Sequence, residues 1–469
     1  MDESSEKQER PVQRQLADSI MRYAPMDDVR ILIAASGANV NASVTKGLRL
    51  LHYAVFHRHV DAVNMLLARG ANPNLMDDVG YTPLHLCAER GYSDIIRILL
   101  LYNARTDFTR VGPTDKAYGC PARASPADEP LRLALKNGHY SAARRLLKSR
   151  ANPNARYFLG HEINLINPLD IESLSLLLEF GADPNSLDRQ GMTSLMRACR
   201  NSEAFESAKL LITYGADVNI MTEEDQRTAM HYAVLSGNMK LVRLLVENGA
   251  TVQLPPDYAK PPPLFFAVLR GNLEMIHYLI DAGADVNAGS AVIGSALHIA
   301  LTERITNKLN IVQTLLENGA DPNALTVSES GPVLKPPLGE YLFACEKPDP
   351  DVIRLLLKFG ARVILLGQRQ HPLGILKSIH RIDPRDGDES FRLITEAAED
   401  FCISLIERSV LMTNRHKLVL LTRATTPLPL LHIARCKVRA LLGWGPQLIF
   451  AVNSLPIPKL LHQYLLYEC

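Results

Sequence analysis

The chain has 469 residues, which is too long for a single hydrophobic core of ordinary size. Its apolar content is 47%, its charged content is 22%, and its formal net charge is only +1. These values argue against a disordered chain and exclude an overall field that would attract nucleic acid or an anionic membrane. Since no apolar run approaches the roughly 18 residues of a membrane-spanning helix, we expect neither nucleic acid nor membrane as a partner.

The seven cysteines are an odd number and include no Cys-x-x-Cys pair. We interpret them as reduced thiols that pack in a core, because disulfides are rare inside cells. The chain is therefore predicted to be cytoplasmic, with the nucleus as a second compartment.

Residues 1–14 are polar, and we expect them to be disordered. From residue 15 to residue 373 the chain repeats one unit, which is clearest over residues 78–107. There Thr82 is an N-cap and Pro83 occupies the first helical position. A second helix follows, and its apolar face consists of Ile95, Ile96, Leu99 and Leu100. Two short helices cannot bury such faces alone, so each unit must stack on its neighbours.

A Gly-Ala-Asp/Asn-x-Asn phrase closes the second helix of most units. It begins at Gly37, Gly70, Gly181, Gly215, Gly283 and Gly319 and, in a less complete form, at Gly249, and weaker forms begin at Asn103, Arg150 and Gly360. From Gly181 to Gly283 the successive phrases are 34 residues apart. The Thr-Pro-Leu-His tetrapeptide, the leucine pairs and this period resemble the ankyrin repeat family. The resemblance implies an all-α solenoid of about nine or ten helix-turn-helix units with short β-hairpin tips.

Three stretches interrupt the period, near residues 112–128, 254–263 and 326–337. We interpret them as insertions between units, since loops this long are uncommon in compact arrays. Residues 374–428 lose the repeat phrase, although residues 389–406 have helical periodicity. We therefore predict a helical cap and connector over 374–428.

Residues 429–469 have a different pattern. Leu430, Ala434 and Val438 recur every four residues and form one helical stripe. A Leu-Pro-Ile-Pro turn and a short apolar helix follow, with Leu455, Pro456, Ile457, Pro458, Leu461, Tyr464 and Leu465. An apolar stripe on so short a segment predicts a partner that covers it.

These two elements resemble the SOCS box, a three-helix module, and the whole chain resembles the ankyrin repeat and SOCS box protein family. The resemblance implies a substrate receptor of a cullin-RING ubiquitin ligase. It implies that elongin C, which is accompanied by elongin B, binds Leu430, Ala434 and Val438, although the family usually has cysteine where Ala434 stands. It also implies that the Leu-Pro-Ile-Pro element, from Leu455 to Leu465, selects cullin-5 with its RING protein.

Histidines His52, His85, His231 and His298 occupy the tetrapeptide position, where they are structural. No other arrangement of histidine, cysteine or serine has the spacing of a catalytic or metal site. We therefore expect no catalytic residue, no metal and no cofactor, and we interpret the chain as a non-enzymatic adaptor. The alternative is an ankyrin scaffold outside any ligase, with its tail folded back on the last repeat.

The substrate is expected to be a protein that binds variable positions of the repeats. The predicted contacts are Tyr81, Arg90, Met192, Arg200, Arg227, Leu235 and Arg270. Aromatic, methionine and arginine side chains are enriched at interface centres, and the four arginines favour an acidic substrate segment. The alternatives are that these arginines are ordinary solvated surface, or that an insertion binds the substrate.

Overall fold

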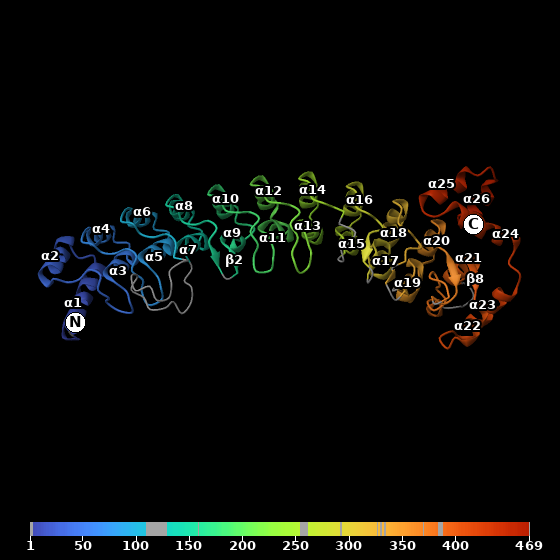
Figure 1. The fold of residues 1–469 in the computed structure, drawn as a ribbon, viewed down its shortest axis with the longest axis horizontal. Coiled ribbons are helices and arrows are strands. Elements are labelled where there is room, and N and C mark those ends of the chain that lie inside the picture. Colours follow the sequence, from blue (N-terminus) through green and yellow to red (C-terminus); the bar gives the residue numbers. More distant parts are fainter. Residues whose placement is uncertain are drawn as a thin grey trace. The chain divides into compact units, whose positions relative to one another are not determined.

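The structure is a computed structural model of the chain. It describes residues 3–108, 129–157, 159–253, 261–290, 293–325, 327–328, 331–332, 334–368, 370–382 and 388–468. The chain divides into two compact units, Met1–Ile220 and Met221–Cys469. Both consist almost entirely of short antiparallel helix pairs, as Figure 1 shows.

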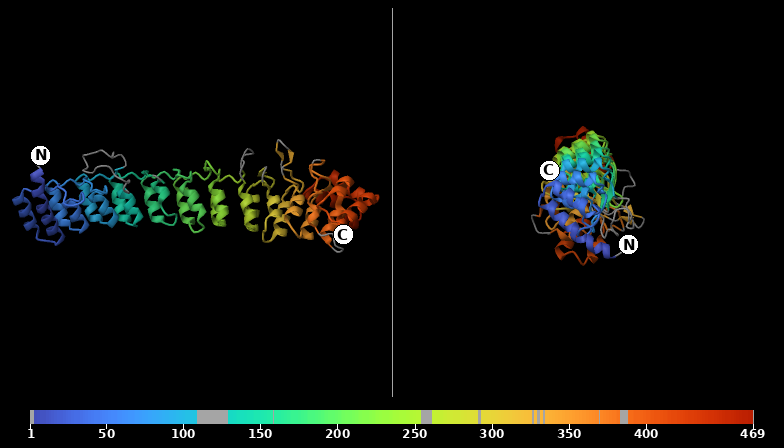
Figure 2. Two further views of the ribbon diagram at one scale, coloured as in Figure 1. Left: turned by 90° about the horizontal axis from the view of Figure 1, so that it is seen from below. Right: turned by 90° about the vertical axis from the view of Figure 1, so that its left-hand side faces the viewer.

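In the first unit, the first helices of successive pairs are α1 (Glu3–Met21), α3 (Leu50–Phe56), α5 (Pro83–Arg90), α7 (Pro130–Lys136), α9 (Glu162–Leu165) and α11 (Ser194–Arg200). The second helices are α2 (Met26–Ser36), α4 (Val60–Ala68), α6 (Ser93–Leu101), α8 (Tyr140–Lys148), α10 (Ile171–Glu179) and α12 (Phe205–Thr213). Second helices pack on second helices, from α4 through α6, α8 and α10 to α12. Figure 1 shows these helices side by side along one edge, in blue to green, and the left-hand view of Figure 2 shows the helices of the same unit from below.

The second unit continues the same pattern. Its first helices are α13 (Ala229–Ser236), α15 (Pro263–Leu269), α17 (Ala296–Thr302), α19 (Pro337–Ala344) and η2 (Ile379–Arg381), a 3-10 helix of one turn. Its second helices are α14 (Met239–Glu247), α16 (Leu273–Asp281), α18 (Lys308–Glu317), α20 (Pro350–Lys358) and α21 (Glu389–Ala397). Five helices complete the chain, namely α22 (Ile403–Arg408), α23 (Asn414–Thr425), α24 (Leu430–Leu442), α25 (Pro446–Ser454) and α26 (Lys459–Leu465).

Short β-hairpins form the tips of several units, as predicted. They pair β1 (Arg156–Tyr157) with β2 (Gly160–His161), β3 (Gly289–Ser290) with β4 (Gly294–Ser295), and β5 (Val327–Ser328) with β6 (Gly331–Pro332). A different, parallel pair joins β7 (Val363–Leu365) to β8 (Ala398–Phe401). The fold class predicted from the repeats is therefore confirmed.

The tetrapeptide residues explain how each first helix begins. At α5, His85 Nδ1 lies 3.1 Å from the Thr82 amide nitrogen and accepts its hydrogen, so the imidazole caps the helix start. Thr228 with His231 and Ser295 with His298 repeat this arrangement. Cys87 and Cys199 are fully buried in the first helices, as expected for small packing residues.

The N-terminal boundary was predicted wrongly. Residues 1–14 were expected to be disordered, but α1 begins at Glu3. Gln13 is only 1% exposed, and its side-chain amide donates to the Asn39 carbonyl at 2.8 Å. The glutamate, lysine, glutamine and arginine residues before it are strong helix formers, so they extend the helix that Leu16 and Ile20 anchor in the core.

The end of the repeats was also predicted too early, at residue 373. The turn η2 packs on α19 and α21 packs on α20, so a further pair follows that reaches Ala397. The first helix of this pair is only one turn long, so the repeat signature that marks the other first helices is absent from its sequence. The expected helix over 389–406 is interrupted by β8, so α21 and α22 are separate.

The insertion near 112–128 lies outside the described residues. Only residues 261–263 of the insertion near 254–263 are described. The insertion near 326–337 contributes the hairpin of β5 and β6. Within the described part of the chain, none of the helices combines the length and apolar composition needed to cross a bilayer.

Candidate protein-interaction surfaces

The C-terminal helices α24, α25 and α26 share a small hydrophobic core. Leu448, Val452, Leu465 and Leu466 are its buried members. Val438, Leu442, Ile449, Leu455 and Ile457 pack around them and are partly buried. Four of the residues predicted to bind partners therefore belong to this core, Leu465 wholly and Val438, Leu455 and Ile457 partly.

Helix α24 has most of its large apolar residues outside and two of its arginines inside, while its other charged residue is exposed. Leu430 is 85% exposed and Leu441 is 86% exposed, and Ala434 between them is also exposed. Arg435 and Arg439, on the opposite face, are buried. A helix that needs no further partner has its apolar side chains buried and its charged side chains exposed, because apolar burial stabilises the fold. The outer face, comprising Leu430, Leu431, Ile433, Ala434 and Leu441, is hereafter called the α24 apolar face.

The inner face of α24 is held by hydrogen bonds to the preceding repeats. The His432 ring donates through Nε2 to the Ala398 carbonyl at 3.0 Å, and Arg435 donates to the Glu396 carbonyl at 3.0 Å. Arg439 donates to the carbonyls of Leu465 and Leu357. These bonds pair most of the donors that the two guanidinium groups bury, although Arg435 Nε is buried without a hydrogen-bond partner among the described residues.

Two tyrosines complete the surroundings of these arginines. The guanidinium carbon of Arg435 lies 4.4 Å from the Tyr464 ring centre and 4.0 Å from the Tyr467 ring centre. Arg439 lies 5.0 Å from the Tyr467 ring on the same side of the helix. Cation–π contacts of this kind are favourable in desolvated sites, so the charged face is a stable structural element.

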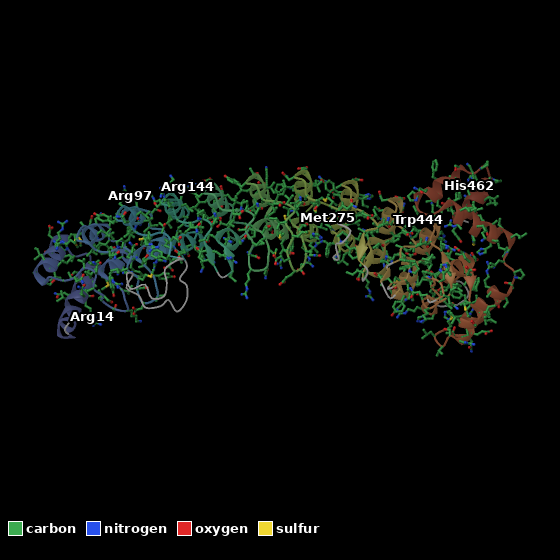
Figure 3. All side chains as sticks on the ribbon, viewed as in Figure 1. Arg14, Arg97, Arg144, Met275, Trp444 and His462 are labelled. Atoms are coloured by element: carbon green, nitrogen blue, oxygen red, sulfur yellow. The ribbon has the colours of Figure 1, made fainter. Side chains whose placement is uncertain are left out.

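Close backbone contacts fix the C-terminal helices against α20. The Gly445 amide donates to the Phe359 carbonyl at 2.8 Å, and Lys358 pairs with Glu468 at 2.7 Å. Trp444, labelled in Figure 3, lies against Gly360 at the end of α20. Gly360 has a φ of +102°, and a Cβ atom there would lie 2.9 Å from Trp444 Cβ. A glycine at this position therefore permits the contact.

The structure brings Leu430 and Ala434 together on the α24 apolar face, as the stripe predicts. In the second predicted element Pro456 and Pro458 are exposed, whereas Leu455 and Ile457 pack on the core. Leu461 and Tyr464 are half-buried, and Leu465 is buried. The interpretation of Leu465 as a contact residue is wrong, because the helix turns this side chain inwards.

Sequence reasoning missed Leu431, Ile433 and Leu441 on the α24 apolar face, and it also missed exposed apolar residues in the two helices that follow. Phe450 in α25 is 77% exposed and Leu460 in α26 is 69% exposed. Helical spacing alone could not find Leu460, since it gives the period of an apolar face but not which face is outside. An isolated Phe450 has no periodic signal at all.

The predicted substrate contacts lie near the ends of first helices. Arg90 and Arg200 in the first unit and Arg270 in the second are exposed. Arg90 lies 5.0 Å above the Phe56 ring, which is itself 50% exposed and was not predicted. Arg270 donates to the Leu235 carbonyl, and Arg227 lies 5.7 Å from the Phe266 ring.

The other predicted contacts have structural roles. The Tyr81 carbonyl accepts from His52 Nε2 at 3.1 Å, and Tyr81 and Leu235 are half-buried. Met192 is only 6% exposed, and its amide donates to Asp188 Oδ1 at 2.9 Å. Met192 is therefore a core residue, and its prediction as a substrate contact is wrong.

Comparison with known families agrees with this architecture. A family model for ankyrin repeats in three copies matches residues 19–111, 166–255 and 254–326, and a single ankyrin repeat model matches residues 129–157. A SOCS box model matches residues 426–466, which contain α24, α25 and α26. The chain belongs to the ankyrin repeat and SOCS box protein family. Both domains of this family are adaptor-type domains rather than catalytic ones.

Individual relatives match only part of this chain. Protein phosphatase 1 regulatory subunit 27 of Mus musculus is 32% identical over 87 residues, or 19% of this chain and 56% of that protein. Ankyrin repeat and KH domain-containing protein mask-1 of Caenorhabditis elegans is 30% identical over 152 residues, or 32% of this chain and 5% of that protein. The chain thus spans about half the length of the first relative and a far smaller part of the second.

Proposed function

We propose that the chain is the substrate-recognition subunit of an elongin B/C–cullin-5 RING ubiquitin ligase. Ankyrin repeats followed by a SOCS box support a substrate-receptor role in general. The observation that carries the finer proposal is the α24 apolar face. Its large side chains are exposed while arginines are buried behind it, so the helix is arranged to be covered by another protein.

Elongin C is the proposed partner of this face. Leu430 protrudes at the start of α24, where a groove can receive it, and Ala434 one turn later is small enough to allow close approach. Val438 would contribute through the part of its surface that the core leaves open. Burying one leucine is worth roughly 1.5–3 kcal/mol, so Leu430 is the expected energetic centre.

Cullin-5 and its RING protein are proposed to bind the opposite end of the module. Pro456 and Pro458 present a stiff exposed turn, and Leu460 adds an exposed apolar side chain. The contribution of the chain to ubiquitin transfer is positional: the repeats hold a substrate while the SOCS box binds the ligase. The contacts between α24 and α20 support this role, because they limit motion between the box and the last repeats.

The rival interpretation, an ankyrin scaffold whose tail covers the last repeat, predicts the same contacts between the tail and the repeats. It does not account for the α24 apolar face, because a tail that only capped the repeats would bury its leucines and expose its arginines. This distribution favours the ligase receptor.

The first prediction tests elongin binding. Leu430→Asp places a charge on the exposed apolar face without touching the core, so we expect it to abolish capture of elongins B and C. The matched control is Leu418→Asp in α23, because Leu418 is 67% exposed and lies outside that face. Co-purification from cells and a thermal melt of each variant provide the measurement. Undiminished elongin C capture by Leu430→Asp would contradict the proposal that the α24 apolar face binds elongin C.

The second prediction concerns the cullin. Replacing only the exposed Pro456 and Pro458 by alanine spares the core contacts of Leu455 and Ile457. We expect the double variant to lose cullin-5 and keep elongins B and C, whereas Pro446→Ala at the start of α25 should keep all three. Recovery of cullin-2 with the wild type would show that the assigned subtype is wrong.

A further inference from the structure

A cavity of about 250 Å³ lies in the second unit, between η2 and the turn that joins α22 to α23. Leu376, Leu405 and Met412 contribute apolar walls, and Leu376 and Met412 are buried. Its volume is below the roughly 300–1,000 Å³ of typical small-molecule pockets. The cavity is therefore suited to one or two side chains rather than to a cofactor.

Two exposed apolar residues form part of the rim of the cavity. Val410 is 96% exposed and Leu411 is 61% exposed, yet both line the cavity. They belong to the turn between α22 and α23 and leave apolar surface in water beside an apolar hollow. Contiguous exposed apolar surface next to a concavity is a feature of binding sites for other proteins.

The residues of the rim that carry a charge at pH 7, Lys377 and Arg408, are both cations. Lys377, His380 and Arg408 line the cavity, and its lining includes no aspartate or glutamate. Among the described residues, Lys377 and Arg408 have no ion-pair partner, so both can bind an anion. Unneutralised cations beside a partly desolvated hollow attract carboxylates more strongly than fully solvated ones do.

The cationic surface continues beyond the cavity. The Phe343 ring, whose residue is 41% exposed, lies 3.6 Å from Lys335 Nζ and 4.5 Å from the guanidinium carbon of Arg381. Burial lowers the pKa of Lys335, Glu340 opposes this effect, and the positive charges of Arg381 and Lys377 lower it further. The positive charges of Arg381 and Lys377 therefore both act on Lys335, and an anionic ligand would relieve this repulsion.

We propose that this cavity binds an acidic peptide segment of a partner protein. A bulky apolar side chain of the segment occupies the hollow between Leu376, Leu405 and Met412. Carboxylates on either side of it bind Lys377 and Arg408, and its backbone covers Val410 and Leu411. The site is separate from the α24 apolar face, so the inference does not require elongin binding.

The test uses the full-length chain and a fluorescein-labelled peptide in which one phenylalanine is flanked by glutamates, with binding followed by fluorescence anisotropy. We expect saturable binding that weakens at least about ten-fold, or 1.4 kcal/mol, in Lys377→Glu/Arg408→Glu and in Val410→Asp/Leu411→Asp. The matched controls are Lys209→Glu/Lys240→Glu and Leu101→Asp, which change exposed residues elsewhere and should bind as the wild type does. Peptides with alanine for phenylalanine or glutamine for glutamate should also bind at least about ten-fold more weakly.

The proposal is overturned if the peptide shows no saturable binding up to millimolar concentration, or if either double variant binds it normally. It is also overturned if sodium laurate binds the cavity and the peptide does not, because the site would then accept a small amphiphile. Elongin C capture by both double variants serves as a folding control. It also separates failure of this site from failure of the ligase proposal, which depends on Leu430.

Discussion

At the scale of single residues, the tetrapeptide histidines both cap a helix and join neighbouring units. His52 Nδ1 accepts from the Arg49 amide at 3.3 Å, and its Nε2 donates to the Tyr81 carbonyl at 3.1 Å. Only a neutral imidazole can accept at one nitrogen and donate at the other. Burial lowers the pKa of both His52 and His231 to about 4, so they are neutral near pH 7.

This protonation state predicts a stability that depends on pH. In the unfolded chain these histidines titrate near pH 6.5, so between pH 6.5 and 4 the unfolded state binds more protons than the folded state. Their contribution is complete above pH 6.5 and decreases as the pH falls, by about 3 kcal/mol per histidine at pH 4. Urea unfolding at pH 7.5 and 4.5 measures the loss.

The matched variants separate this effect from general acid sensitivity. His231→Phe imitates Phe265, which occupies the same position of the next unit and is buried. It should reduce the difference between the two pH values, whereas His277→Phe in an exposed position of α16 should not. An equal acid-induced loss in the wild type and His231→Phe would contradict the assigned role.

At the scale of elements, the last asparagine of the repeated phrase connects consecutive units. Asn287 Nδ2 donates to the Gly319 carbonyl at 2.8 Å, and Asn287 Oδ1 accepts from the Asp321 amide at 2.8 Å. The same pair of bonds begins at Asn41, Asn74, Asn154, Asn185 and Asn323. The glycine of the phrase thus sets the backbone conformation at the end of the helix, whereas its asparagine connects consecutive units.

We predict that Asn287→Ala lowers the free energy of unfolding by about 1–2 kcal/mol, because it removes two hydrogen bonds between units. Asn287→Asp keeps the acceptor and should cost less. Asn310→Ala, an exposed position of α18, is the control and should change stability by less than about 0.5 kcal/mol. Urea denaturation measures stability, and faster hydrogen exchange at the Asp321 amide is expected in Asn287→Ala alone.

The elements also show what could be predicted from the sequence. The period and the phrase predicted the helix pairs because the same residues recur wherever a helix must begin or end. They did not predict that η2 and α21 form a further pair, although periodicity predicted a helix over 389–406, because this pairing depends on contacts with α19 and α20 rather than on a local signal. On α24, spacing identified Leu430 and Ala434, but the depth of Val438 and Leu465 is set by the core of three helices.

At the scale of the whole molecule, each compact unit contains its own buried core. The contacts that hold α24 come from Leu357, Glu396 and Ala398, and all of them belong to the second unit. In repeat proteins stability depends on neighbouring repeats rather than on distant ones. The second unit therefore contains what the SOCS box needs to stay folded.

The last prediction follows from this division. A fragment covering Met221–Cys469 should fold, as circular dichroism can show, and should capture elongins B and C as the full chain does. A fragment covering Met1–Ile220 should capture neither. Residues 426–469 alone should be less helical and capture elongins more weakly, because Arg435 and Arg439 would lose the carbonyl groups of the repeats that accept their hydrogen bonds. If the isolated box were as helical as it is in the longer fragment and bound elongins equally well, the inner face of α24 would have no supporting role, and its exposed leucines alone would account for recruitment.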